Sequence, residues 1–333
     1  MAAPEADMML ALLNLYRAMN PTEQFMQTLR GCDGYTTLEF QDLFMTQVVQ
    51  NTICDDYAPK RSYTFRILKL YVQDVENAGE ELSDLLLADV LASVCHKNVS
   101  LGSADLDELH HVSYRIPRAG PVVVDDVITC RVAAAHNEVG MKLWEAGFFL
   151  AEYALSHPHV FQGKRILELG AGAGFTGLVI AAMPSVAAHV MLTDYAPVVM
   201  QNLRYNIEVN APRLTCPVTA MALDWTEWTW DADNATAYDL LIAGDCVYDV
   251  DAFPDMMHVL GSFLDGDKAA AAIFASTLRN QKTFDAFLTQ LRDHAIVYED
   301  ITAAAAKDMP QYYDYANRDS IRLCRLTRSL PLN

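Results

Sequence analysis

One short segment constrains this chain more than any other. Residues 165–177 read Arg-Ile-Leu-Glu-Leu-Gly-Ala-Gly-Ala-Gly-Phe-Thr-Gly, an apolar strand that runs into a glycine-rich turn. A helical pattern follows at 175–183. Glycines let a ligand approach the backbone closely, and the first turn of a helix presents free N–H groups. The segment therefore predicts a strand–loop–helix unit that binds a cofactor.

The pattern around this segment predicts the fold class. After Gly140, apolar strand patterns alternate with helical ones. Strands are expected at 164–169, 189–194, 217–222, 239–245, 270–276, 295–301 and 320–327, and helices at 144–156, 175–183, 196–209, 251–264 and 281–293. Such alternation is typical of a doubly wound, mostly parallel sheet. We expect an α/β domain with a Rossmann-like sheet of seven strands.

Two classes of cofactor fit a glycine loop of this kind. Gly172, Gly174 and Gly177 match the dinucleotide pattern G-x-G-x-x-G, and Asp194 lies at the distance beyond them that such a pattern requires. In a dinucleotide fold, however, the first glycine closes the strand, and here Gly170 has already closed it. The position of the loop relative to the strand therefore argues against NAD.

An acid precedes the loop, as in methyltransferases that use S-adenosyl-L-methionine. The loop reads Glu168-x-Gly170-x-Gly172-x-Gly174. A carboxylate at Glu168 can hold the ammonium group of the methionine moiety, whereas NAD would place its pyrophosphate close to that carboxylate. We therefore expect S-adenosyl-L-methionine as the cofactor.

Acidic and aromatic residues end the next two strands. Asp194 can accept hydrogen bonds from both ribose hydroxyls, and the alternative is that it caps the helix at 196–209. Asp224 could accept from the adenine amino group, while Trp225 could pack on the ring or simply in the core. Trp144 opens the helix before the first strand and could cover the methionine end of the cofactor, or pack in the core.

The fourth strand of the sheet is apolar and then abruptly polar at its carboxyl end, from Gly244 to Asp249. Ligands of open α/β sheets bind at that edge, so Asp245 and Tyr248 are expected to face the transferred methyl group. A lysine acceptor must lose a proton, because its free pKa is roughly 10.4. A carboxylate and a phenol could orient the amine and help pass the proton to water. A purely structural role for the pair is the alternative.

The chain before Gly140 has a different character. Residues 1–108 carry helical periodicity, with possible helix starts at Asn20-Pro21-Thr22-Glu23 and at Thr36 with Glu39. Short β-rich runs between 112 and 132 predict a hairpin that leads into the second domain. We expect an N-terminal helical domain at 1–108 and a catalytic domain at 109–333.

Composition narrows the function classes. The 333 residues carry a formal net charge of -19, which disfavours binding to nucleic acid. The seven cysteines form no CxxC pair, and the histidine pairs, expected on loops, offer no metal site. The acidic start does not resemble a signal peptide, and the longest apolar stretch is too short for a membrane span. We expect a cytoplasmic monomer without a metal or a membrane contact.

Five separated motifs occur in the order of a known family. They are W-E-A at 144–146, I-L-E-L-G-A-G-A-G-F-T-G at 166–177, L-T-D at 192–194, L-D-W at 223–225 and D-C-V-Y at 245–248. Together they resemble the family-16 protein-lysine methyltransferases, which are class I enzymes. The helical N-terminal region, the segment 57–63 and the hairpin are most similar to the lysine methyltransferases of eukaryotic elongation factor 2. Leu143-Trp144-Glu145 replaces the usual Thr-Trp-Asp, and Gly244 stands where alanine is usual.

The resemblance implies an activity and a set of cofactor contacts. It implies methyl transfer to a protein lysine, with elongation factor 2 as the expected acceptor. Carried onto matching positions, the cofactor contacts are Trp144, Gly170, Ala171, Gly172, Asp194, Trp225, Gly244 and Tyr248. The alternatives are a methyltransferase acting on another protein lysine or on a small molecule, and a binding module that has lost catalysis.

Overall fold

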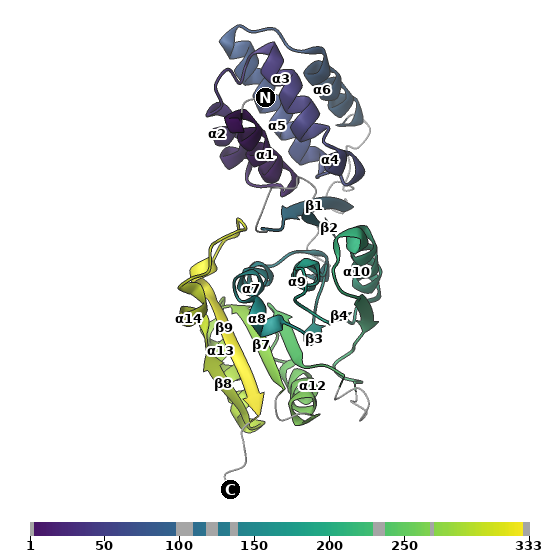
Figure 1. Cartoon of the computed structure of the whole chain (residues 1–333), viewed down its shortest axis with the longest axis vertical. Coiled ribbons are helices and arrows are strands. Elements are labelled where there is room, and N and C mark those ends of the chain that lie inside the picture. Colours follow the sequence, from purple (N-terminus) through teal and green to yellow (C-terminus); the bar gives the residue numbers. More distant parts are fainter. Residues whose placement is uncertain are drawn as a thin grey trace. The chain divides into compact units, whose positions relative to one another are not determined.

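The computed structural model describes residues 3–97, 109–117, 126–133, 139–228, 237–266 and 270–328. The chain divides into two compact units, Met1–Asn137 and Glu138–Asn333. Figure 1 shows both units with most of their helices and strands labelled.

The first unit consists of helices followed by a two-stranded hairpin. Its elements are α1 (Ala3–Arg17), α2 (Thr22–Arg30), α3 (Leu38–Phe44), the π-helix η1 (Met45–Val49), α4 (Thr52–Asp56), α5 (Arg61–Ala78), α6 (Asp84–Lys97), β1 (Leu109–Arg115) and β2 (Val127–Ala133). The two strands pair antiparallel. Their connection, expected around Gly120, lies outside the described residues.

This unit has an apolar core of its own, built from all of its larger helices. The ring of Phe44 meets the edge of Tyr71 at a centroid distance of 5.0 Å, and the Tyr71 hydroxyl donates to the backbone oxygen of Tyr35 at 2.6 Å. Gln41 is fully buried, and its amide donates to the backbone oxygen of Glu81 at 2.9 Å. These two buried polar side chains are therefore paired, as a stable core requires.

The two helix starts expected from the sequence lie within a residue or two of the observed ones, but the capping residues differ. Helix α2 begins at Thr22, with Pro21 rather than Asn20 in the capping position. Helix α3 is capped by the Thr37 hydroxyl, not by Thr36. The reason in the second case is local, since the backbone oxygen of Thr36 is engaged by the buried Gln41 amide at 2.8 Å.

The second unit is a sheet of seven strands with helices on both faces. Its strands are β3 (Arg165–Leu169), β4 (His189–Asp194), β5 (Val218–Ala222), β6 (Leu240–Gly244), β7 (Ala271–Thr277), β8 (Ile296–Asp300) and β9 (Ile321–Arg328). Its described helices are η3 (Val139–Met141), α7 (Glu145–Ser156), α8 (Pro158–Phe161), α9 (Phe175–Ala182), α10 (Pro197–Asn210), η4 (Ala211–Arg213), α12 (Phe253–Gly266), α13 (Gln281–Asp293), α14 (Thr302–Ala306) and η5 (Arg318–Ser320).

The strand order is β5-β4-β3-β6-β7-β9-β8. Strand β9 runs in the opposite direction to the other six, so its pairs with β7 and with β8 are antiparallel. The order reverses at β3, which has β4 on one side and β6 on the other. Open α/β sheets bind their ligands at such a switch point, beyond the carboxyl ends of the strands.

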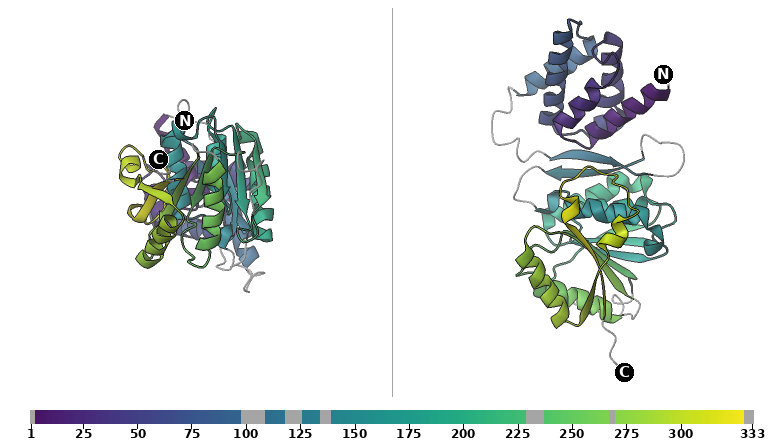
Figure 2. Two further views of the ribbon diagram at one scale, coloured as in Figure 1. Left: turned by 90° about the horizontal axis from the view of Figure 1, so that it is seen from below. Right: turned by 90° about the vertical axis from the view of Figure 1, so that its left-hand side faces the viewer.

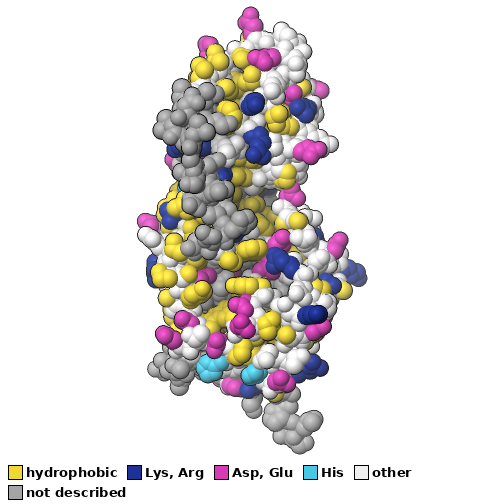
Figure 3. Space-filling model, turned by 180° about the vertical axis from the view of Figure 1, so that it is seen from behind, with side chains coloured by type: hydrophobic (Ala, Val, Ile, Leu, Met, Phe, Trp, Pro, Cys, Tyr) yellow, Lys and Arg dark blue, Asp and Glu magenta, His cyan; other side chains and the backbone are white. Residues whose placement is uncertain are grey.

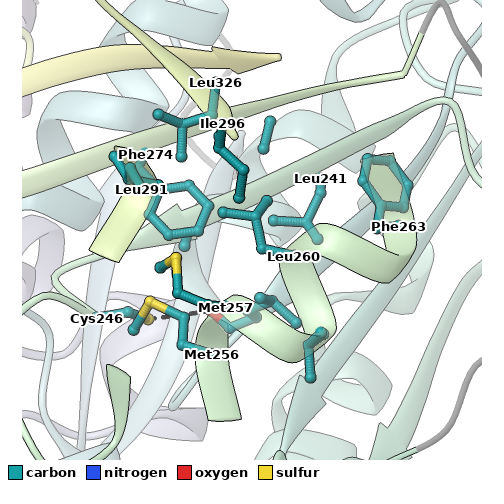
Figure 4. Packing of buried hydrophobic residues seen from close by; sticks show 14 of the residues in the cluster. Leu241, Cys246, Met256, Met257, Leu260, Phe263, Phe274, Leu291, Ile296 and Leu326 are labelled. Atoms are coloured by element: carbon teal, nitrogen blue, oxygen red, sulfur yellow. Dashed lines mark hydrogen bonds between the residues drawn. The ribbon is translucent and has the colours of Figure 1, made fainter. Parts of the chain in front are cut away.

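Side chains of alternate residues in β3 face the two helical layers, which Figure 2 shows on either face of the sheet. Leu167 and Leu169 belong to a core cluster with residues of α12 and α13. Figure 4 shows this cluster, in which Leu260 of α12 and Leu291 of α13 meet Phe274 of β7. Glu168 lies on the other face, toward α9.

The fold class expected from the sequence is confirmed. Each of the seven predicted strands and five predicted helices of the second unit is present, with ends shifted by two residues or fewer. Among the described residues, five short helices were not predicted: the α-helices α8 and α14 and the 3-10 helices η3, η4 and η5. Three of the four paired histidines are not on loops: His110 and His111 lie within β1, and His159 lies within α8. His157 lies in the short break between α7 and α8.

The hairpin falls within the first unit, whereas the sequence analysis grouped it with the second domain. The physical reason is contact with the helices, since the backbone N–H of His111 donates to the oxygen of Ala58 at 3.0 Å. The rings of Tyr57 and His111 also meet, with their centroids 5.4 Å apart. The expected boundary between 108 and 109 adjoins residues outside the described set, and the functional division into domains stays a prediction.

Charged side chains are distributed rather than gathered on the visible surface. On the face seen in Figure 3, Lys and Arg side chains lie singly or in small groups among Asp and Glu. Within the described part of the chain, no helix combines the length and the apolar character that crossing a membrane would require.

Candidate active site

The site residues expected from the sequence lie at the carboxyl edge of the sheet, with one exception. The glycine loop follows β3, Asp194 ends β4, and Gly244 ends β6. Because these three strands are adjacent and parallel, their carboxyl ends meet at one edge, beside the switch point. The exception is Glu168, which lies inside β3.

The glycine loop adopts backbone conformations that favour glycine. Gly170, Gly172 and Gly174 have φ values of 58°, 54° and 86°. At Gly172 a Cβ atom would also lie 2.9 Å from the backbone oxygen of Gly140, so no larger residue fits without a shift. The N–H of Ala171 donates to the oxygen of Thr193 at 2.8 Å. The loop is therefore fixed against the end of β4, and it forms a cradle with no side chain at its turning point.

Asp194 holds the glycine loop and the start of α10 together. Its carboxylate accepts hydrogen bonds from the N–H groups of Gly172 at 3.0 Å, Tyr195 at 2.8 Å and Ala196 at 3.4 Å. Burial raises the pKa of Asp194 above its ordinary value, and these three N–H groups act in the opposite direction. Asp194 therefore ties down the turn before α10 and does not cap that helix, whose N-cap residue is Ala196. The role of accepting ribose hydroxyls stays a prediction.

Glu168 is the exception to the edge arrangement because its side chain lies between β3 and α9. It is 3% exposed, and a Cβ atom on Gly177 of α9 would come within 2.5 Å of its Oε2 atom. Oε2 has no hydrogen-bond partner among the described residues. Burial raises the pKa of Glu168 to about 8, against the effect of the Gly177 N–H. Direct contact with the ammonium of a cofactor stays a prediction.

The adenine-side residues follow β5. Asp224 is exposed, and its Oδ1 atom accepts from the N–H of Thr226 at 2.9 Å and from the Thr226 hydroxyl at 2.8 Å. These bonds lower the pKa of Asp224 below its ordinary value. Trp225 is half-buried and packs against the core cluster between α12 and the sheet. Both lie at the expected strand end, and their contacts with an adenine stay predictions.

Gly244 explains one departure from the family pattern. Its α-hydrogen side faces α7, and a Cβ atom there would lie 3.2 Å from the Cα atom of Gly147. The glycine at 244 therefore lets helix α7 pack directly on the end of β6. The side chain of Thr176 in α9 donates to the oxygen of Gly147 at 3.1 Å, which ties α7 to the helix that begins at the glycine loop.

Asp245 has a strained backbone and a fully engaged carboxylate. Its φ value is 58°, in the left-handed region, which costs a residue other than glycine roughly 1–2 kcal/mol. The carboxylate accepts from the N–H groups of Ala146 (3.3 Å) and Thr277 (2.9 Å), from the Thr277 hydroxyl (3.0 Å), and twice from the Arg279 guanidinium (3.1 Å each). These donors come from three elements, and together they hold the strained conformation in place.

Arg279 is the functional candidate that the sequence reasoning did not single out. Besides Asp245, its guanidinium donates to Oε2 of Glu145 at 2.6 Å, and it lies 5.2 Å from the ring centroid of Trp144. The Trp144 indole N–H donates to the oxygen of Val139 at 3.0 Å, and the residue is 36% exposed. Nothing in the sequence showed that Arg279 pairs with two carboxylates.

Tyr248 is the most open residue of the predicted site, at 62% exposed. Desolvation and the neighbouring Cys246 thiol raise its pKa above the ordinary value, so its phenol is neutral at physiological pH. Cys246 itself is buried, and its thiol donates to the oxygen of Leu169 at 3.4 Å (Figure 4). Tyr248 therefore presents an exposed, neutral phenol shortly after the carboxyl end of β6.

A buried carboxylate in α7 anchors the connection between α14 and η5, and the sequence gave no sign of it. Glu152 is fully buried and accepts from the N–H groups of Tyr312 (2.7 Å) and Tyr313 (3.0 Å), from the Tyr315 hydroxyl (2.6 Å), and from the Arg318 guanidinium. The guanidinium of Arg318 also lies over the ring of Phe149 at 5.2 Å. This connection leads into β9 at the same edge of the sheet as the site.

A seven-stranded sheet in this order, with a glycine loop after β3 at the switch point and an acid at the end of the neighbouring strand β4, defines a class I methyltransferase. The sequence model of a family described as Lysine methyltransferase matches residues 127–294, half of the chain. The protein belongs to this lysine methyltransferase family. The resemblance inferred from the five motifs is thereby confirmed, and so is S-adenosyl-L-methionine as the methyl donor.

Curated relatives match over most of the chain. Protein-lysine N-methyltransferase EEF2KMT of Homo sapiens is 28% identical over 265 residues, covering 76% of this chain and 77% of its own. Protein-lysine N-methyltransferase EFM3 of Chaetomium thermophilum is 25% identical over 334 residues, covering 91% of this chain and 98% of its own. A solved structure of P. horikoshii TYW2 in complex with MeSAdo is 14% identical, covers 68% of this chain and 72% of its own, and has a TM-score of 0.38.

The residues present fit S-adenosyl-L-methionine. The turn at Gly172 is a cradle that a side chain would fill, and Asp194 beside it is a carboxylate suited to accept from hydroxyl groups. The buried Oε2 atom of Glu168 lacks a partner among the described residues, and this cofactor carries positive charge. The two acidic side chains and the open glycine turn thus suit a cationic nucleoside.

Proposed function

We propose that this enzyme transfers a methyl group from S-adenosyl-L-methionine to a lysine side chain of another protein. The observation that carries the proposal is the composition of the site beyond the glycine loop. Two carboxylates, Asp245 and Glu145, lie there with the aromatic ring of Trp144, and the phenol of Tyr248 follows three residues after Asp245. A lysine combines an aliphatic chain with a cationic amine, and such a site suits both parts.

Elongation factor 2 is the acceptor that we propose. Relatives named EEF2KMT match 76% and 92% of the chain, and the second unit holds only 196 of the 333 residues, so both matches extend into the first unit. We also propose that the enzyme acts as a cytoplasmic monomer. The described cysteines are free, in keeping with a reducing compartment.

The cofactor would be held by residues on both sides of β3, and when bound it supplies an activated methyl group on a sulfonium. We propose that the following residues hold it: Trp144, Glu168, Gly170, Ala171, Gly172, Gly174, Asp194, Asp224, Trp225 and Gly244. Asp194 would accept from the ribose, and the cradle at Gly172 would receive the methionine end. No metal takes part in this proposal.

Asp245 and Tyr248 would act on the acceptor side. They would orient the acceptor amine toward the methyl group that the bound cofactor would supply, and would help pass the amine proton to water. Since methyl transfer of this kind is a direct displacement, the enzyme mainly positions the partners in line. Asp245, saturated by five donors, is suited to hold the shape of the site, while the open phenol of Tyr248 is suited to contact the amine.

The acceptor protein can be identified with labelled cofactor. The enzyme is incubated with methyl-labelled S-adenosyl-L-methionine and either a cytosolic lysate or purified elongation factor 2. We expect one dominant labelled protein in the lysate, at the size of elongation factor 2, and label in the purified factor. Label confined to small molecules would contradict methyl transfer to a protein. Label on a different protein would contradict elongation factor 2 as the acceptor. Binding of S-adenosylhomocysteine, measured in parallel, confirms that the enzyme is competent.

A further inference from the structure

One arginine connects the parts of the site that face the acceptor. Arg279 lies in the turn between β7 and α13. Its guanidinium forms a bidentate ion pair with the carboxylate of Asp245, in which both N···O distances are 3.1 Å. The same group donates to Glu145 at 2.6 Å and lies over the ring of Trp144. A planar guanidinium can make these contacts at once, whereas a lysine ammonium cannot reproduce the fork.

The guanidinium of this cluster is more exposed to solvent than either of its two carboxylates. The Asp245 side chain is 5% exposed and that of Glu145 23%, whereas that of Arg279 is 42% exposed. The carboxylates are therefore covered by the guanidinium, which itself faces solvent. An acceptor that approaches this edge meets the arginine together with the remaining exposed part of Glu145.

The charges in this cluster do not cancel. Glu145 and Asp245 carry two negative charges and Arg279 one positive charge, so the net charge is close to -1 at neutral pH. The adjacent titratable groups, the Cys246 thiol and the Tyr248 phenol, have raised pKa values and stay neutral there. The side chain of Asn317, which donates to Glu145 at 3.2 Å, adds no charge.

Charge at this place matters because a lysine must be cationic to be attracted and neutral to react. Unpaired carboxylates near an amine favour its protonated form and raise its pKa. Two of them would hold an ammonium ion well and would keep it unreactive at neutral pH. A guanidinium already paired with both carboxylates reduces that effect.

We propose that Arg279 is a positioning residue that fixes Asp245 and Trp144 and partly neutralises the two carboxylates, so that the acceptor lysine can release its proton at physiological pH. The inference rests on the proposed function, because it requires a lysine acceptor. It predicts that the charge at residues 145 and 279 sets the pH at which the rate rises.

The test measures kcat against pH for methylation of the protein acceptor by full-length variants. In Arg279→Met the pH at which kcat rises to half of its maximum should increase by roughly one unit or more. At neutral pH, kcat should therefore fall at least about tenfold. Arg279→Lys should have a pH midpoint close to that of the wild type, because the positive charge is kept. Its kcat should stay below the wild-type value, because an ammonium group cannot form the bidentate pair with Asp245. Glu145→Gln should move the midpoint to lower pH, and the double variant should return it toward the wild-type value.

A matched control uses another arginine that pairs with an aspartate in the same manner. Arg30 donates to Asp74 at 2.7 and 3.0 Å in the first unit, and Arg30→Met should leave the pH midpoint unchanged. Melting curves and affinity for S-adenosylhomocysteine report folding for every variant. Should Arg279→Met lose its fold, the shift of the pH midpoint to lower pH expected for Glu145→Gln still decides.

The outcomes separate the inference from the proposed function. If the wild-type enzyme methylates lysine and the variants keep its pH midpoint, with rates reduced only in proportion to folded protein, Arg279 is merely structural and the inference is overturned. If the wild-type enzyme binds S-adenosylhomocysteine but methylates no lysine, the proposed function fails, and the inference fails with it.

Discussion

Asp194 accepts hydrogen bonds from three backbone N–H groups, so its substitution must keep the shape of the side chain if cofactor binding is to be measured alone. Asp194→Asn keeps the shape and removes the charge; its one oxygen can still accept from Tyr195 and Ala196, while the bond from Gly172 is lost. We expect the affinity for S-adenosylhomocysteine to fall about 10- to 100-fold, the effect of weakening hydrogen bonds to a charged group worth roughly 1.5–3 kcal/mol. Isothermal calorimetry measures it.

Asp300 offers a matched control for this prediction. It ends β8 as Asp194 ends β4, and its carboxylate accepts from the N–H of Thr302 at 2.9 Å as α14 begins. Asp300→Asn should leave the affinity unchanged. If both variants bind S-adenosylhomocysteine as the wild type does, Asp194 only holds the backbone of the glycine loop and of the turn before α10.

The buried carboxyl of Glu168 makes stability depend on pH in a defined direction. Its pKa is about 8 in the folded protein against an ordinary 4.5, so between these pH values the folded state keeps a proton that the unfolded chain releases. Rising pH therefore favours unfolding across this window. Glu168→Gln does not titrate, so its free energy of unfolding relative to the wild type should increase from pH 5 to pH 8. Melting curves without cofactor measure this, and parallel pH dependences would refute it.

At the scale of elements, the sequence predicted what depends on local patterns. Strand ends at Leu169, Asp194 and Gly244 could be located because apolar runs stop there at glycine or an acid. The contacts that build the site could not, because they join distant residues. Arg279 and Glu145 are 134 positions apart, and neither residue type specifies its partner. The left-handed backbone of Asp245 was equally unreadable, since glycine is the usual signal for that conformation.

The anchor between α7 and the connection that leads into η5 is open to a stability test. Glu152 is fully buried and pairs with Arg318, whose side chain is 20% exposed. Removing one partner of a buried ion pair typically costs about 3 kcal/mol or more. Glu152→Gln should therefore lower the melting temperature by roughly 6–12 °C for a unit of this size.

Glu208 provides the control, because it lies exposed on α10. Glu208→Gln should change the free energy of unfolding by less than about 0.5 kcal/mol. Equal melting temperatures for the two variants would mean that the buried pair contributes nothing to stability.

At the scale of the whole molecule, the two compact units suggest a division of labour. Every residue proposed to hold the cofactor follows Glu138, where the second unit begins. A folded protein acceptor usually needs about 1,200–2,000 Å² of buried surface for specific binding, and the helical unit could supply part of it. A truncated protein that begins at Glu138 should bind S-adenosylhomocysteine but no longer methylate elongation factor 2.

A cooperative melt with retained cofactor binding would exclude aggregation as the cause of that loss. If the truncated enzyme methylated the factor at the full-length rate, the first unit would have no part in recognition.

The central claim is that the methyl group goes to a lysine side chain, and fragment mass spectrometry tests it most directly. Elongation factor 2 is incubated with the full-length enzyme and a deuterated methyl donor, digested, and fragmented to locate the label. We predict label on the Nζ atom of one lysine, absent when the enzyme is omitted. Label on any other residue type, or an unlabelled factor beside an enzyme that binds S-adenosylhomocysteine, would contradict the account.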